Sequence, residues 1–114
     1  MAEGETRYEL LGRELRYRAV SVTTPDGVRI AAQDWRREGS GRDVLFIHGF
    51  AQAHLSWLKQ VTGPLADAFR LVTYDNRGHG GSDKPLDPAF YRDPRRWADE
   101  VDAVIRQLGL DRPA

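Results

Sequence analysis

The sequence predicts an α/β fold with parallel central strands and helices packed against them. Residues 44–47 ("VLFI") and 70–75 ("RLVTYD") are largely apolar without alternation, which is typical of strands covered on both faces of a parallel sheet. A stretch with helical periodicity follows each of them. Strands that alternate with helices favour this fold class over an all-β or all-α one.

The N-terminal part of this fold is predicted to be a β-hairpin. Residues 20–24 and 28–32 alternate apolar and polar side chains on either side of Pro25-Asp26-Gly27. Proline fixes φ and glycine tolerates a positive φ, so these three residues suit a turn. One face of each strand is expected to be half-buried.

The chain has 114 residues, a length that fits one small domain. Residues 1–12 show no clear periodicity. We expect them to form a loosely ordered extension, which leaves residues 13–114 as the predicted domain.

The first helical stretch follows the strand at residues 44–47. Residues 53–69 place Leu55, Leu58 and Val61 on one face. Gly63-Pro64 is expected to interrupt this helix, because proline lacks an N–H donor and its ring clashes with the preceding turn.

The clearest helix is predicted at residues 93–109. Asp93 can cap its N-terminus, Pro94 suits the first turn and Gly109 suits the C-terminal stop. Its apolar stripe consists of Trp97, Val101, Val104, Ile105 and Leu108. The charged residues between them are expected to form a solvated face: Asp99, Glu100, Asp102 and Arg106.

Composition excludes several classes of function. Lys+Arg and Asp+Glu number 17 each, and this balance argues against a nucleic-acid binder and gives no reason to expect an anionic membrane surface as partner. The sequence has no cysteine, which excludes disulfides, thiolate metal sites and a cysteine nucleophile. The N-terminus is charged and has no apolar signal-peptide core, so a cytoplasmic location is expected.

The stretch "HGF" at residues 48–50 is the candidate site. It follows a predicted buried strand, and ligands of open α/β sheets bind beyond the carboxyl ends of the strands. Gly49 permits a close approach or an unusual backbone angle, so we expect the backbone N–H of Phe50 to point into a cleft. A fixed and free N–H is what an oxyanion hole needs for acyl transfer.

Three motifs occur in order along the chain: "VLFIHGFAQAHLSW", "LVTYDNRGHGGSDKP" and "WADEVDAVIRQLGL". In this strand–helix setting they resemble the N-terminal part of the α/β-hydrolase fold, in its serine esterase, perhydrolase and epoxide hydrolase branch. The resemblance runs from about residue 20 to the end of the chain. It implies an N-terminal portion of the hydrolase sheet, with a hairpin, parallel strands and flanking helices, that is incomplete.

The resemblance implies roles for particular residues. Phe50 matches the position whose backbone N–H forms half of the oxyanion hole, and His48 and Gly49 match the pair that shapes that loop. Trp57 matches a helix position that packs. A loop that is mainly structural in the family is matched by Asp75, Arg77, Gly78, Gly80, Ser82 and Asp83.

The family's nucleophile occupies a G-x-S-x-G elbow, in which Asp replaces Ser in some members. None of the four serines has glycines two residues before and two residues after it; Ser82 has Gly80 before it but Lys84 after it. No Asp meets the pattern either. The nucleophile, the acid and the catalytic histidine are therefore expected beyond Ala114, and the chain alone is expected to be inactive.

The histidines and the Gly-rich loop have alternative interpretations. His48, His54 and His79 fit no metal-ligand spacing, so no metal and no cofactor is expected. The His48 side chain is expected to hydrogen-bond the neighbouring loop, and His54 and His79 are expected to be solvated. The sequence "GHGGSD" has Asp83 where the G-x-G-x-x-G pattern ends in glycine, and no helix follows it immediately, which excludes a dinucleotide loop.

In the family's sheet the strand at residues 44–47 lies between the strand at 70–75 and the nucleophile strand. Without the nucleophile strand it would present an apolar edge, open to a complementary chain or to self-association, and the chain would be marginally stable.

Two functions stay open. One is a fragment of a hydrolase that acts on carboxylic esters or related small molecules by serine nucleophilic acyl transfer, or on epoxides with an Asp nucleophile. The other is a non-catalytic binding or interaction module.

Overall fold

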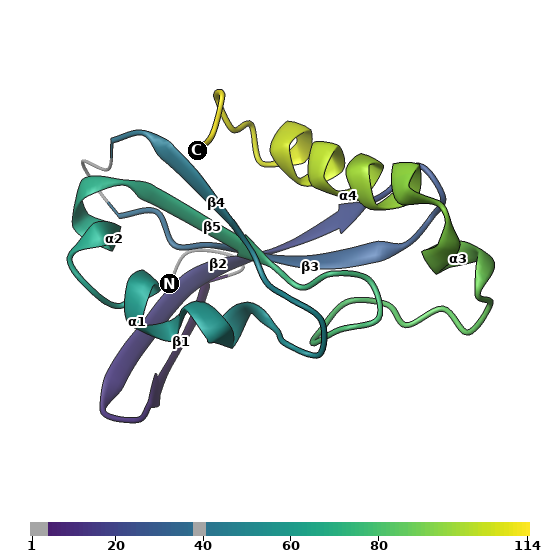
Figure 1. The fold of residues 1–114 in the computed structure, drawn as a ribbon. Helices are drawn as coiled ribbons and strands as arrows, with labels where there is room; N and C mark the ends of the chain where they lie inside the picture. Colours follow the sequence, from purple (N-terminus) through teal and green to yellow (C-terminus); the bar gives the residue numbers. More distant parts are fainter. Residues whose placement is uncertain (1–4, 38–40) are drawn as a thin grey trace.

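A computed structural model describes residues 5–37 and 41–114 of the chain. Five strands form one sheet in the order β1-β2-β3-β5-β4 (Figure 1). The strands are β1 (Glu5–Leu10), β2 (Arg13–Thr23), β3 (Arg29–Asp34), β4 (Asp43–Ile47) and β5 (Arg70–Tyr74). The helices are η1 (His54–Trp57), α1 (Leu58–Val61), α2 (Leu65–Ala68), α3 (Ala89–Arg92) and α4 (Pro94–Gln107).

The two apolar strands are parallel neighbours, as the sequence predicts. β4 and β5 run in register from Asp43 beside Arg70 to Ile47 beside Tyr74. β3 joins the other side of β5 in the antiparallel direction. The sheet is therefore mixed, and the α/β fold class is confirmed.

The predicted hairpin is confirmed as β2 and β3, which are antiparallel. Gly27 has φ of +81°, the left-handed region that glycine adopts without steric cost. Two hydrogen bonds between Thr24 and Val28 close the turn. The backbone N–H of Thr24 donates to the carbonyl of Val28 at 3.0 Å, and the backbone N–H of Val28 donates to Thr24 Oγ1 at 3.0 Å.

The N-terminal segment differs from the expected loosely ordered extension. Residues 1–4 lie outside the described residues, but β1 pairs with β2 along its whole length. Leu11 and Gly12 form the turn between them, both at positive φ. Backbone hydrogen bonds hold this hairpin together. Because the side chains of β1 are mostly polar, its sequence shows no apolar alternation that would predict a strand.

Apolar side chains pack on both faces of the sheet. One cluster joins Ala103 and Val104 of α4, together with Leu108 at its C-terminal cap, to the strands. The other joins Val61 of α1 and Ala66 of α2 to the strands, so helices cover the two faces as expected for this fold class (Figure 1). The strand residues of the first cluster are Val22, Ile30, Ala32, Val72 and Tyr74, and those of the second are Leu15 and Leu71.

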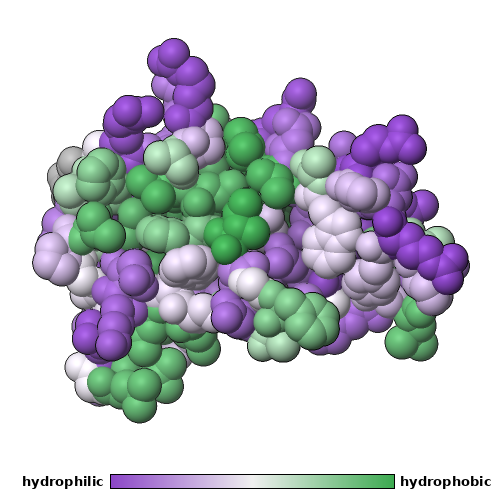
Figure 2. Space-filling model, viewed as in Figure 1, coloured by the Kyte–Doolittle hydropathy of each residue, from purple (hydrophilic) through white to green (hydrophobic). Residues whose placement is uncertain are grey.

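Burial differs between the two parallel strands. Every residue of β5 is buried, as predicted. β4 is only half-buried and its Ile47 is 49% exposed, so the expectation of full coverage is wrong for β4. The reason is its place at the end of the strand order. Figure 2 shows apolar side chains gathered over the part of the molecule where β4 and β5 lie.

The outer edge of β4 carries one further pair of backbone hydrogen bonds. The N–H of Leu45 donates to the carbonyl of Ala114 at 2.9 Å, and the N–H of Ala114 donates to the carbonyl of Asp43 at 3.0 Å. These two bonds flank Val44 in the pattern of a parallel ladder. Ala114 therefore lies where a strand parallel to β4 would run.

The helical predictions hold with one addition, the helix α3. The stretch at 53–69 is broken between α1 and α2 at Gly63-Pro64, as expected. The long helix is confirmed as α4, where Asp93 Oδ1 accepts from the N–H of Arg95 at 2.9 Å. The short helix α3 was not predicted. Among the described residues, no helix combines the length and the apolar character that crossing a membrane requires.

Glu100 of α4 corrects the predicted solvated face, because it is fully buried. It lies three residues after Trp97 and four before Val104, which places it within the apolar stripe. Its Oε1 accepts from Arg77 Nε at 2.8 Å, and Arg77 is also fully buried. The helix therefore anchors the loop that follows β5.

Candidate functional site

The loop after β4 begins with His48, Gly49 and Phe50, directly beyond the carboxyl end of the strand. The Phe50 side chain is 92% exposed. Among residues 5–37 and 41–114, nothing accepts a hydrogen bond from the backbone N–H of Phe50. Ala51 follows with φ of +61°, a conformation that a residue with a Cβ seldom adopts. The loop thus presents an unpaired donor at a turn held in an uncommon conformation.

His48 holds this loop against the loop that follows β5. It is buried, and its Nε2 accepts from the backbone N–H of Asn76 at 2.9 Å. That donor requires the proton of the ring to sit on Nδ1, which lies 2.7 Å from the carbonyl of Gly49. The side chain of Asn76 also donates to the carbonyl of His48 at 3.2 Å. The expectation that His48 hydrogen-bonds the neighbouring loop is confirmed.

His79 makes a second connection between the two loops, and the expectation that it is solvated is wrong. Its Nε2 accepts from the N–H of Ala51 at 3.1 Å, while its Nδ1 lies 3.0 Å from the carbonyl of Arg77. The ring of Phe50 meets the His79 ring edge-on, with 5.9 Å between centroids. His48 and Ala51, which flank Gly49 and Phe50, are therefore both hydrogen-bonded to the loop that follows β5.

His54 is the third connection, and it is also not solvated. Its Nδ1 lies 3.0 Å from Asp75 Oδ1, and its backbone N–H donates to the same oxygen at 2.7 Å. Burial of Asp75 opposes its ionisation, but the hydrogen bonds from His54 and Gly81 outweigh it and hold the pKa of this carboxyl below its ordinary value. His54 Nε2 is buried and has no partner among the described residues.

The Gly-rich loop after β5 is shaped around Asp75. The N–H of Gly81 donates to Asp75 Oδ2 at 3.0 Å, and Ser82 Oγ donates to its backbone carbonyl at 2.5 Å. A Cβ at Gly80 would collide with the Asp75 carboxylate, and Gly80 has φ of +48°. This position therefore requires glycine, which agrees with a structural role for the loop.

Arg77 anchors the same loop in the interior. Besides Glu100 it contacts Asp26 of the β2–β3 turn, with 2.7 Å between Arg77 Nη1 and Asp26 Oδ2. The hydrogen bond from Arg77 lowers the pKa of Asp26 to about 2. Burial raises the pKa of Glu100 above its ordinary value, even though Arg77 opposes that rise.

The structure brings together every residue that the sequence singled out after β4 and β5. His48, Gly49 and Phe50 form one loop, and Asp75 and Arg77 hold the other loop against it. Trp57 packs on Phe46 of β4 with 4.9 Å between ring centroids. Sequence reasoning missed the connections made by Asn76, His54 and His79. The described residues contain no group of three or more His, Cys, Asp or Glu side chains able to hold a metal ion.

Comparisons with known proteins identify related chains. A protein of Mycobacterium tuberculosis named probable oxidoreductase EphD is 43% identical over 94 residues, which are 81% of this chain and 15% of that protein. The bifunctional esterase/perhydrolase DCH of Acinetobacter calcoaceticus is 38% identical over 92 residues, which are 78% of this chain and 31% of that protein. This chain therefore spans less than a third of either relative.

A solved structure is also similar to this chain over part of its length. The fold matches that of a putative aryl esterase from Burkholderia cenocepacia with a TM-score of 0.79 and 43% identity, covering 84% of this chain and 35% of that one. Other similar proteins carry the names haloperoxidase and epoxide hydrolase. The sequence pattern of the alpha/beta hydrolase fold matches residues 44–114. The chain therefore belongs to the alpha/beta hydrolase fold family.

Proposed function

We propose that this chain is the N-terminal part of a serine hydrolase that acts on carboxylic esters or related small molecules. The observation that carries the proposal is the unpaired backbone N–H of Phe50 at the carboxyl end of β4. Ligands of open α/β sheets bind at that end of the strands. The family and the likeness to esterases support the same reaction class.

The chemistry assigned to this N–H is oxyanion stabilisation. The catalytic histidine takes the proton of the serine hydroxyl as the serine oxygen attacks the carbonyl carbon of the ester, and the carbonyl π electrons move to oxygen. The Phe50 N–H then donates to the oxyanion of the tetrahedral intermediate, which collapses to an acyl-enzyme as the histidine returns the proton to the leaving alcohol. Water then attacks the acyl-enzyme in the same way, so that the carboxylic acid and the free serine are released. His48 and His79 are positioning residues, because they fix the loop around Phe50 through hydrogen bonds to backbone groups.

The serine, the acid and the catalytic histidine would come from a segment other than residues 1–114. We propose that this segment includes an apolar strand that pairs in parallel with the outer edge of β4. The two hydrogen bonds between Ala114 and β4 support this position, as does the exposure of Ile47. The segment can continue the same chain or belong to a complementary one, since backbone pairing does not distinguish them.

A chimera tests the proposal. The part of the Burkholderia cenocepacia aryl esterase that follows its region of similarity to this chain is fused after Ala114. Hydrolysis of p-nitrophenyl acetate is measured for the chimera, for Phe50→Pro and for Phe50→Ala. Proline removes the N–H, whereas alanine keeps it and removes only the exposed ring.

Loss of one oxyanion donor typically lowers kcat by about 100- to 1,000-fold, or about 2.7–4 kcal/mol. We expect a loss of this size for Phe50→Pro and a much smaller one for Phe50→Ala. Equal kcat values for the two variants, with both folded by circular dichroism, would reject the assignment of Phe50. An epoxide substrate turned over in place of the ester would reject the substrate class.

A further inference from the structure

Two histidines hold the Phe50 loop (residues 48–53) against the loop that follows β5, and both do so in the same way. His48 Nε2 accepts from the backbone N–H of Asn76 at 2.9 Å, and His79 Nε2 accepts from that of Ala51 at 3.1 Å. A backbone N–H can only donate, so neither Nε2 carries a proton. Each Nδ1 lies 2.7 Å or 3.0 Å from a backbone carbonyl oxygen, which can only accept. Both rings are therefore neutral, with the proton on Nδ1.

A second proton on either ring would break a contact between the two loops. Protonation turns Nε2 into a donor, and a donor cannot accept from the backbone N–H that faces it. The Nδ1 bond to the carbonyl survives, since an imidazolium donates from both nitrogens. The two ring centroids are 5.1 Å apart, so the rings would also repel each other once both are charged. The neutral form is thus a condition for the loop to stay in place.

His54, the third histidine of the chain, has a different setting. Its Nδ1 lies 3.0 Å from Asp75 Oδ1, and a neighbouring carboxylate favours the charged form of an imidazole. In the part of the chain that the structure describes, no carboxylate contacts the ring of His48 or His79. A proton on His54 leaves its contact with Asp75 intact, whereas a proton on either of the other rings removes a contact. His54 can therefore serve as the matched control.

Other charged side chains close to the two rings are already paired. Residues 75–84, in the loop that follows β5, contain these charged side chains: Asp75, Arg77, Asp83 and Lys84. The two carboxylates are held by His54 and Arg29. The guanidinium is held by Glu100 and Asp26, and the ammonium group by backbone carbonyls at 2.6 and 3.2 Å. Residues 49–53 carry no ionisable side chain, so the charge of the two rings decides this contact between the loops.

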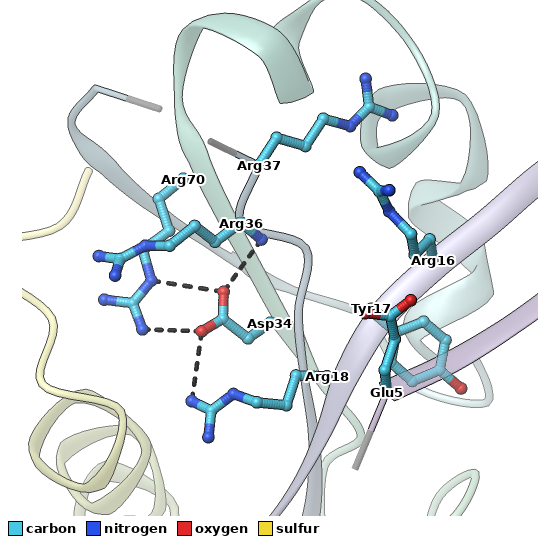
Figure 3. Close-up of a pocket in the computed structure, with 8 residues that line it drawn as sticks. All are labelled: Glu5, Arg16, Tyr17, Arg18, Asp34, Arg36, Arg37 and Arg70. Carbon is cyan, nitrogen blue, oxygen red and sulfur yellow. Dashed lines mark hydrogen bonds and ion pairs between the residues drawn. The ribbon is translucent and has the colours of Figure 1, made fainter. Parts of the chain in front are cut away.

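The buried carboxylates of the described residues are Asp34, Asp75 and Glu100. Figure 3 shows Asp34 between the guanidinium groups of Arg70 and Arg18, which lie 2.9 Å and 3.5 Å from its Oδ2. Burial opposes ionisation of Asp34, but the hydrogen bond from Arg70 outweighs it and lowers the pKa of this carboxyl. The pKa of Asp75 is lowered as well, whereas burial raises the pKa of Glu100. Glu100 must therefore be present in every variant whose pH dependence is compared.

Ala51 makes the position of the Phe50 N–H sensitive to these bonds. Its φ of +61° lies in a region that a residue with a Cβ adopts only when surrounding contacts hold it there. The hydrogen bond from its N–H to His79 is such a contact. Relaxation of Ala51 would turn the preceding residue, Phe50, and change the direction in which its N–H points.

We propose that His48 and His79 form a pH-sensitive switch that sets the position of the oxyanion donor. The charge of histidine changes between about pH 8 and about pH 5. As the pH falls through this range each ring takes a proton from solvent, the bonds to Asn76 and Ala51 break, and the loop moves away. The released loop binds more protons than the held loop, so a rise in pH favours the held loop. This inference rests on the proposed role of the Phe50 N–H.

Nitrogen-15 NMR of the chimera tests the switch without a substrate. Ring-nitrogen signals distinguish a protonated Nε2 from an unprotonated one, and exchange of the Ala51 and Asn76 amides with D₂O reports the two bonds. At about pH 8 both rings should carry their proton on Nδ1. Between about pH 8 and about pH 5 the protection of both amides, corrected for intrinsic exchange, should fall by about fivefold or more, as expected for the loss of one hydrogen bond each. Protonation of Nε2 that leaves both amides unchanged would overturn the proposal.

Substitution separates the switch from the other groups that titrate. His48→Gln/His79→Gln can place an amide oxygen where each Nε2 accepts, and this oxygen gains no proton; His54→Gln is the control. kcat for p-nitrophenyl acetate is measured at about pH 8 and about pH 5 for the chimera and both variants. Glu100 and the catalytic histidine are present in all three proteins, so their titration affects each ratio of the two kcat values alike. The ratio should be lower by about fivefold or more in the double variant and within about twofold of the parent in His54→Gln. Equal ratios in the two variants would overturn the proposal.

The switch and the proposed function fail in different ways. Ester hydrolysis by a chimera whose Ala51 and Asn76 amides do not respond to pH would reject the switch and keep the proposed function. Amides that respond to pH in a folded chimera that hydrolyses no ester would reject the proposed function and leave the switch in the loop.

Discussion

Replacement of Arg77 by methionine should be among the most destabilising single changes in this chain. Arg77 is fully buried and its guanidinium serves Glu100, Asp26 and the carbonyl of Phe90. Methionine leaves Glu100 buried without its cation. Breaking a buried ion pair by removing one partner destabilises a protein by about 3–5 kcal/mol. Asp26 retains some exposure and can regain water, so most of the loss comes from Glu100.

Urea unfolding of the chimera, followed by tryptophan fluorescence, measures the loss. The matched control is Arg106→Met, which removes an exposed ion pair with Asp102 one helical turn away and should change stability by about 0.3–0.5 kcal/mol. Adding Glu100→Gln to Arg77→Met should restore part of the stability, because the uncompensated charge is gone. If the free energies of unfolding of Arg77→Met and Arg106→Met differ by less than about 1 kcal/mol, the buried pair does not anchor the loop.

The remaining predictions concern the loop, the pH dependence and the open edge. His48→Leu removes two hydrogen bonds and should lower the free energy of unfolding by about 1–3 kcal/mol; a urea midpoint equal to that of Arg106→Met would contradict this. Because the pKa of Asp26 is lower in the folded chain, at about 2, than its ordinary value of 3.8, its stabilising contribution is present above pH 3.8 and lost as the pH falls toward 2. The difference in unfolding free energy between the wild type and Asp26→Asn should shrink over that range, and a constant difference would be inconsistent with the pair. With the edge of β4 open, the 114-residue chain should unfold at low temperature or self-associate; cooperative unfolding of a pure monomer at high temperature, seen by calorimetry with light scattering, would argue against this.

The strands and the long helix could be predicted because their signals are local. β5 is apolar throughout and entirely buried, and α4 carries its cap, its stripe and its stop within one continuous stretch. The charge of Glu100 predicts a solvated position, whereas its spacing from Trp97 and Val104 places it in the buried stripe. Charge alone is misleading here, because the cation that makes the burial of Glu100 possible lies 23 residues earlier.

The candidate site was only partly predictable for a related reason. The position of Phe50 beyond a parallel strand follows from the sequence, since the carboxyl end of a parallel strand is the expected place for a ligand. The partners of His54 and His79 depend on which loop lies opposite in space. The sequence of each loop does not show which loop lies opposite it, so both side chains are predicted to be in solvent.

Ester hydrolysis by the chimera is the most direct test of the central claim that this chain supplies the oxyanion loop and the β4 edge of a hydrolase. p-Nitrophenyl acetate turnover is measured for the 114-residue chain, for the esterase segment and for the two fused. Turnover is expected for the fused protein alone. Turnover by the isolated chain well above a heat-treated control, or a folded chimera that hydrolyses no ester, would contradict it.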